Sequence, residues 1–145
     1  MLSRTPEEYD TCITGGQVEI TPFEIEDLIE LSKSQKVIVD TNIPVDILRK
    51  ISDYNHVAIL LSPQRMSVDD FFNRKDLDKI FILEQIMKTE NPESTLENFK
   101  KCIEKINSLE HYNEFLNSGF KCFIRKENSN LEDRYSQIIK HFKLM

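Results

Sequence analysis

Glycine is scarce in this chain, which has only three among its 145 residues, at Gly15, Gly16 and Gly119. Tryptophan is absent, and no apolar run approaches the roughly 18 residues that a membrane-spanning helix needs. The opening residues, Met1 to Glu8, lack the apolar centre of a secretory signal peptide. These absences argue against a low-complexity chain and a membrane protein, and they favour a helix-rich globular fold.

Cysteine is also sparse. The three cysteines are widely spaced and odd in number, and no Cys-x-x-Cys pair occurs; they are Cys12, Cys102 and Cys122. The histidines show no metal-ligand spacing to them, so nothing in this pattern predicts a zinc site or a disulfide framework. We interpret the cysteines as reduced thiols and the histidines as structural residues of a cytoplasmic protein.

Acidic residues outnumber basic ones by 25 to 19, which gives a formal net charge of −6. This surplus of negative charge disfavours nonspecific binding to nucleic acid or to an anionic membrane surface. Hydrophobic residues make up 39% of the chain, which is enough for one modest core. We therefore expect residues 1–145 to form a single domain that binds neither nucleic acid nor membrane.

Two short apolar runs predict buried parallel strands. Lys36–Asp40 and Val57–Leu61 carry apolar residues at successive positions, as strands covered on both faces do. Between them, Pro44 opens a short helix that reaches about Ile51. The three segments together predict a βαβ unit.

Helical patterns account for most of the remaining chain. Thr21 as N-cap and Pro22 at the first helical position predict a helix over 22–34. Further helices are predicted from a cap at Ser67 through Phe72, over about 76–89, from Asn91 onward, and over about 131–142. A third strand is predicted at 120–124, after a turn at Gly119. The expected fold is α/β and three-layer, with a short parallel sheet of about three strands and helices on both faces.

Asp40 is the most informative single residue, because an acid at the carboxyl end of a buried parallel strand lies where α/β sheets bind ligands. Three interpretations stay open. Asp40 would hold magnesium beside nucleotide phosphates in a P-loop enzyme. In a PIN-like ribonuclease, Asp40-Thr41-Asn42 would end the first strand of the domain, and Asp40 would bind the metal with Glu84 as a second carboxylate. Otherwise it caps the helix near Pro44.

A cluster of basic residues follows the second predicted strand. It comprises Arg65, Arg74 and Lys75, on or between predicted helices. Arginine side chains in such a place can clamp phosphate oxygens through paired hydrogen bonds. A solvated helix face is the alternative interpretation of the same cluster.

The ordered series of these features resembles the second half of bacterial P-loop kinase-like proteins related to nucleotide and shikimate kinases. The series covers residues 36–127, about two thirds of the chain, and its order carries the resemblance because no single motif is diagnostic. Its parts are Val37-Ile38-Val39-Asp40, the strand from Val57 to Pro63, Phe71-Phe72-Asn73-Arg74, the helix led by Asn91-Pro92-Glu93-Ser94, and Ser118-Gly119-Phe120 with the strand after it.

The resemblance implies a role for each matching position. Asp40 corresponds to the magnesium-site acid, and Arg74 to the catalytic arginine of a helical lid over about 65–90. Arg65 and Lys75 are implied to bind the nucleotide, with ATP and Mg²⁺ as cofactors and a small molecule as substrate. Residues 15–17, which are Gly15, Gly16 and Gln17, lie where such kinases often place substrate-binding backbone.

The chain departs from this family at its phosphate-binding loop, because no Gly-x-x-x-x-Gly-Lys-Ser/Thr occurs anywhere in it. We therefore expect an ATP-dependent phosphotransferase relative that is inactive as an isolated chain. A noncatalytic interaction module and a PIN-like metal-dependent ribonuclease are the alternatives. The strand that carries this loop in the family lies between the two strands predicted at 36–40 and 57–61. Its absence predicts exposed sheet edges, which either close on each other or pair in a homodimer.

Overall fold

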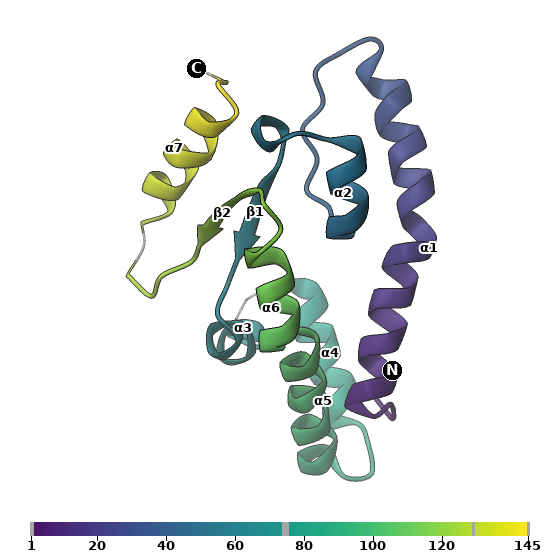
Figure 1. Ribbon diagram of the computed structural model, residues 1–145. Coiled ribbons are helices and arrows are strands. Elements are labelled where there is room, and N and C mark those ends of the chain that lie inside the picture. The colour runs from purple at the N-terminus through teal and green to yellow at the C-terminus, as the bar shows by residue number, and fades with distance from the viewer. Residues whose placement is uncertain (1, 74–75, 129, 145) are drawn as a thin grey trace.

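The computed structural model describes residues 2–73, 76–128 and 130–144, and it is mostly helical with one short sheet (Figure 1). The elements in chain order are α1 (Pro6–Ser32), α2 (Val45–Ile51), the 3-10 turn η1 (Tyr54–His56), β1 (Ala58–Leu61), α3 (Gln64–Phe71), α4 (Leu77–Met87), α5 (Pro92–Ile106), α6 (Leu109–Leu116), β2 (Lys121–Ile124) and α7 (Leu131–His141). The predicted α/β class is confirmed. No helix within the described ranges is long and apolar enough to cross a membrane.

Helix α1 begins sixteen residues earlier than the sequence pattern predicts. Its N-terminus is a capping box, in which the Glu8 amide donates to the Thr5 hydroxyl at 3.2 Å and the Glu8 carboxylate accepts from the Thr5 amide at 2.9 Å. The prediction of a helix start at Thr21 is wrong, because Pro22 lies inside α1. The same Thr-Pro-x-Glu signature occurs at both places, and the first one begins the helix. The buried Thr21 hydroxyl instead donates to the Gln17 carbonyl at 2.7 Å.

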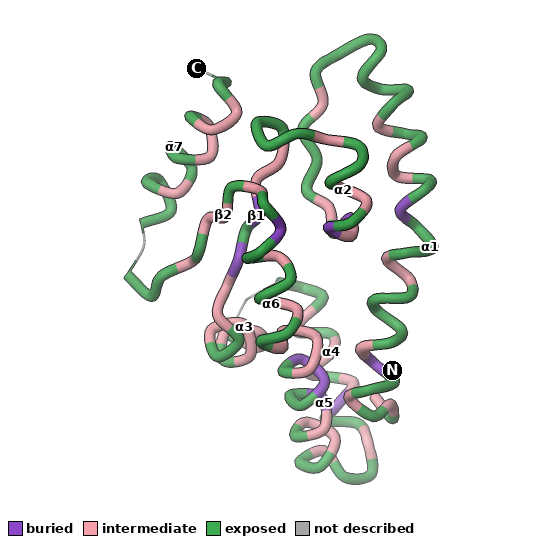
Figure 2. Tube along the Cα trace, viewed as in Figure 1, coloured by how far each residue is buried: buried purple, intermediate pink, exposed green. Residues whose placement is uncertain are grey.

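The main core lies where α4 and α5 pack together, and α1 and α3 close it. Ile86, Phe99 and Ile103 are almost fully buried and form its centre, with Phe71 and Phe72 packed against them. Figure 2 shows buried segments at this end of the molecule, in β1, at the start of α2 and in the turn before β2, while most of α1 is exposed. The apolar side chains of α5 share one helical face, so burial of that face stabilises the bundle.

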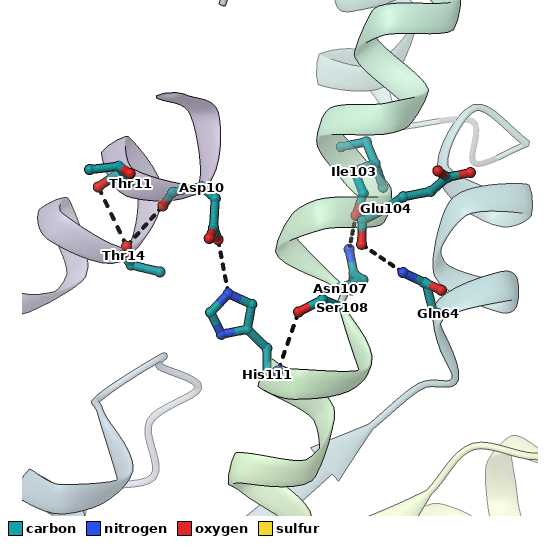
Figure 3. A network of polar contacts seen from close by, with 9 residues as sticks. All are labelled: Asp10, Thr11, Thr14, Gln64, Ile103, Glu104, Asn107, Ser108 and His111. Atoms are coloured by element: carbon teal, nitrogen blue, oxygen red, sulfur yellow. Dashed lines mark hydrogen bonds and ion pairs between the residues drawn. The ribbon is translucent and has the colours of Figure 1, made fainter. Parts of the chain in front are cut away.

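Polar contacts fix the helices around this core (Figure 3). The Asp10 carboxylate on α1 lies 2.9 Å from Nε2 of His111 on α6, and both side chains are largely shielded from solvent. The Gln64 side-chain amide on α3 donates to the Glu104 carbonyl on α5 at 2.8 Å. The prediction that His111 is structural agrees with this arrangement, because its ring joins two helices that are far apart in the sequence.

Strands β1 and β2 pair in parallel, with Ala58 opposite Lys121 and Leu61 opposite Ile124. Helices contact the two faces of this sheet at β2. Cys122 contacts the Phe115 carbonyl of α6 at 3.6 Å, and the neighbouring Phe123 ring lies 5.8 Å from His141 of α7. Because successive side chains of a strand point to opposite faces, α6 and α7 lie on opposite sides of the sheet.

The first predicted strand, Lys36–Asp40, is not a strand in this structure, and the predicted βαβ unit is therefore wrong. The segment is an irregular stretch that returns from the end of α1 towards α2 (Figure 1), held to α1 by a 3.0 Å hydrogen bond from Thr41 to Glu24. A strand exists only where a neighbour pairs with it, and none lies beside this run within the described residues. The pairing of β1 with β2 uses α3 to α6 as its crossover.

The remaining boundaries are close to those predicted, with two exceptions. Helix α3 begins after Pro63, so Ser67 is inside it and does not cap it. Helix α6 was not predicted, although Ser108 is a good N-cap whose hydroxyl accepts from the His111 amide at 3.3 Å. Gly119 has the expected role, because its φ of 90° belongs to the left-handed region that favours glycine in turns. The helices at α2, α4, α5 and α7 and both remaining strands are confirmed.

Replacing Phe99 by alanine should lower the free energy of unfolding by about 3–5 kcal/mol, because Phe99 is 2% exposed and sits at the core centre. Leu77→Ala is the matched control, since Leu77 is 85% exposed on α4, and its effect should stay within about 0.5 kcal/mol. Urea unfolding followed by circular dichroism measures both. Equal effects of the two substitutions would contradict this placement of the core.

Candidate functional site

The carboxyl ends of β1 and β2 form the candidate site. The two strands are parallel, so Leu61 and Ile124 end at the same edge of the sheet. In open α/β proteins this edge is where ligands bind. Ser62 and Pro63 lead from β1 into α3, and Arg125 directly follows β2.

Two ion pairs join α3 to the segment after β2. The Arg125 guanidinium lies 2.7 Å from the Asp70 carboxylate, and the Arg65 guanidinium contacts the Glu127 carboxylate directly. The Arg125 amide also donates to the Leu61 carbonyl at 2.8 Å, which fixes the backbone of Arg125 against the end of β1. The Arg125 side chain is 30% exposed, whereas Arg65 and Glu127 are mostly exposed. Arg125 is therefore the better ordered cation of the site.

The chemistry of this cluster is anion recognition. Two guanidinium groups present planar, paired donors that match phosphate oxygens, and two carboxylates neutralise them in the absence of a ligand. A phosphate group would compete with Asp70 and Glu127 for the same donors. The arrangement offers charge and hydrogen bonds to such a group.

Arg65 was expected to bind the nucleotide, whereas Arg125 was not singled out from the sequence. The signal for Arg125 was present, since it is the first residue after a correctly predicted strand. Its partner Asp70 was not singled out either. The two other basic residues expected here, Arg74 and Lys75, lie outside the described residues.

The structure places the other predicted site residues elsewhere in the fold. Asp40 is exposed in the segment before α2 and is not at the end of a strand. The three residues expected to bind substrate through their backbone, Gly15, Gly16 and Gln17, lie inside α1. Backbone groups within a helix are engaged in its own hydrogen bonds, so they are not presented to a ligand there.

The residues present do not fit a magnesium site by themselves. Among the described residues, no group of three or more His, Cys, Asp or Glu side chains converges as metal ligands do. Asp40 is a single exposed carboxylate. Glu84, the expected second carboxylate of a ribonuclease site, lines a groove of about 420 Å³ beside Leu83 and Met87 of α4, and Asp40 does not line it.

Two of the three cysteines are shielded thiols. Burial raises the pKa of Cys102 above its ordinary value of 9.0, and the Glu7 carboxylate raises it further. Burial likewise raises the pKa of Cys122, although Ser118 and Lys121 lower it in part. A raised thiol pKa means less thiolate at neutral pH, which disfavours either residue as a nucleophile.

Comparisons of this chain with models of protein families, with curated proteins and with solved structures find no match. The function proposed below therefore rests on the residues, their contacts and the stated resemblance.

Alkylation should discriminate among the three thiols. In the native protein near pH 8, exposed Cys12 should react with iodoacetamide first, and Cys102 and Cys122 should react much more slowly, because their thiolate forms are disfavoured. Raising the pH above 9.0 should speed the reaction of Cys102 and Cys122, whose pKa values lie above that ordinary value. Peptide mass spectrometry measures each site, and unfolded protein in urea is the control. Cys102 reacting as fast as Cys12 in the native state would contradict its burial.

Proposed function

We propose that this chain is the substrate-side part of a P-loop kinase-like protein, from the family of ATP-dependent small-molecule phosphotransferases, and that it is inactive by itself. The observation that carries the proposal is the pair of arginines at the carboxyl edge of two parallel strands. Arg65 and Arg125 come from segments about 60 residues apart, and each forms an ion pair between α3 and the segment after β2, Arg65 with Glu127 and Arg125 with Asp70.

The order of elements supports the same proposal. From β1 the chain passes through two helices in the lid region, α3 and α4, and then through α5 and α6 before it returns to the sheet at β2. Apart from α6, this order matches the series on which the resemblance rests. Contact of α6 and α7 with the two sheet faces at β2 is consistent with a small version of the three-layer architecture.

Catalytic inactivity follows from what the sequence lacks. Phosphoryl transfer depends on donors aimed at the developing charge, and the glycine loop with its lysine supplies most of them in P-loop enzymes. The chain carries no such loop, and its glycines at 15 and 16 lie within a helix. The two arginines alone provide binding without positioning a nucleophile.

A second candidate, a noncatalytic interaction module, is favoured by the surface of α1. Several large apolar side chains of this helix are uncovered, with Val18, Ile20, Phe23 and Ile29 all more than half exposed. Exposed apolar residues gathered along one helix are typical of a protein interface. The ribonuclease alternative gains no comparable support, because the described carboxylates do not gather around Asp40.

A titration with ATP tests the phosphate site. The chain should bind ATP weakly, with a dissociation constant on the order of 1 mM, or about −4 kcal/mol. Amide NMR signals of Arg125 and its neighbours should shift most. Arg125→Gln should abolish these shifts, and Asp70→Asn should tighten binding, because it removes the carboxylate that competes for Arg125. Lys50→Gln, an exposed change of charge on α2, is the control and should leave the shifts intact.

The same sample tests for turnover. No ATP hydrolysis above the blank is expected, with or without magnesium. Binding on the order of 1 µM, about −8 kcal/mol, together with hydrolysis would mean that another part of the chain cradles the phosphates. An absence of shifts at Arg125 in saturating ATP would contradict the phosphate site and leave the interaction module as the better account.

A further inference from the structure

The outward edge of β1, which is the edge that faces away from β2, carries backbone amides and carbonyls without hydrogen-bond partners among the described residues. The Leu61 carbonyl accepts a hydrogen bond from Arg125, so the amide and carbonyl of Leu61 point towards β2. Backbone groups alternate along a strand, and those of Ala58 and Leu60 therefore point away from β2. Neither residue has a hydrogen bond on that side within the described residues. The Leu60 side chain is also 60% exposed, although it lies in the middle of a strand.

A second segment also lacks a partner for its backbone amides and carbonyls. Lys36–Asp40 carries a β-branched run, belongs to no helix or strand, and makes no backbone hydrogen bond within the described residues. Ile38 is 72% exposed and Val39 is 51% exposed. Valine and isoleucine favour strands because their side chains pack well on a half-buried sheet surface. The chain thus holds an open strand edge and an unpaired strand-forming run at the same time.

We propose that these two features bind each other between two copies of the chain. In this dimer, the Lys36–Asp40 run of one copy adds to the outward edge of β1 in the other, and the exchange is reciprocal. Each copy gives one run and accepts one, so a two-fold axis relates the two copies. Both features are then occupied, and the dimer does not bind a third copy through them. Each sheet gains a third strand, and Leu60, Ile38 and Val39 lose their exposure to water.

A second copy is the occupant that the structure supports best. The strand edge specifies an extended polypeptide, and among the described residues the chain itself supplies an unpaired apolar run of that kind. The run does not pair with β1 of its own chain in this structure.

This inference does not depend on the proposed function. The phosphate site uses Arg65 and Arg125 at the carboxyl end of the strands, whereas the dimer uses the side edge of β1. It also differs from the exposed face of α1, where apolar side chains alone do not specify what covers them. The formal charge of −6 on each copy opposes association, so added salt should strengthen the dimer.

Sedimentation of a dilution series tests the dimer directly. The natural chain should change from dimer to monomer on dilution. Leu60→Lys and Ile38→Lys should each weaken the dimer by at least about tenfold, because each puts a charge into the new strand pair. Ile124→Lys at the outer edge of β2 and Leu77→Lys on α4 are matched controls at other exposed apolar positions, and they should leave it unchanged. Thermal melts confirm that every variant is folded.

Cross-linking separates the exchange from other dimers. In a Cys12→Ser background, one preparation carries Ile38→Cys and another carries Leu60→Cys. Mixed and oxidised, they should form a disulfide between positions 38 and 60, which joins two different chains by design. A monomer at every concentration would overturn the proposal. A dimer that survives both lysine substitutions would also overturn it. A dimer that is lost in Leu60→Lys but kept in Ile38→Lys would overturn it too, because that result would indicate pairing of β1 with β1.

Discussion

Backbone hydrogen bonding between β1 and β2 is the interaction on which the organisation of the sheet region depends. Each strand has four residues, and neither would exist without the other. Their pairing brings α3 and the segment after β2 together, so it also creates the cluster of Arg65, Asp70, Arg125 and Glu127. The same rule explains what is missing. The Lys36–Asp40 run has the composition of a strand but no neighbour, and it therefore stays unpaired.

The helical part of the molecule has its own source of stability. Phe99 and Ile103 of α5 pack against Ile86 of α4, and α1 and α3 cover them. Side-chain hydrogen bonds such as Asp10 to His111 then fix the orientation of neighbouring helices. This division means that the sheet edge can be altered at Leu60 or Ile38 without loss of the main core. It also means that an open sheet edge is compatible with a folded chain.

Local signals in the sequence predict the elements whose formation depends on local interactions. Asn91-Pro92 marks the start of α5, Gly119 marks the turn before β2, and both remaining strands were placed within one residue. Two failures have physical causes. The capping signature at Thr21 is overridden because an identical signature at Thr5 starts the helix first, and propensity alone does not choose between them. The run at 36–40 fails because strand formation depends on a partner that local sequence does not reveal.

The candidate site was predicted only in part for the same reason. Arg65 was recognised because it follows a strand, but its ion pair with Glu127 depends on the parallel pairing of segments about 60 residues apart. Asp40 was expected at the sheet because the run before it was expected to be a strand. Once that run is unpaired, the carboxylate lies in solvent and no longer joins the arginines. The position of Arg65 after a strand was therefore readable from local sequence, whereas the position of Asp40 was not.

Native-state amide exchange along β1 tests this account most directly, because it reports each backbone partner separately. In dilute solution, the amides of Ile59 and Leu61 should be protected by β2, whereas those of Ala58 and Leu60 should exchange rapidly. At concentrations that favour association, the Leu60 amide should become protected while Ile59 and Leu61 change little. Equal protection of all four amides in dilute solution would contradict the account, because it would show that the outward edge of β1 is already paired within one chain.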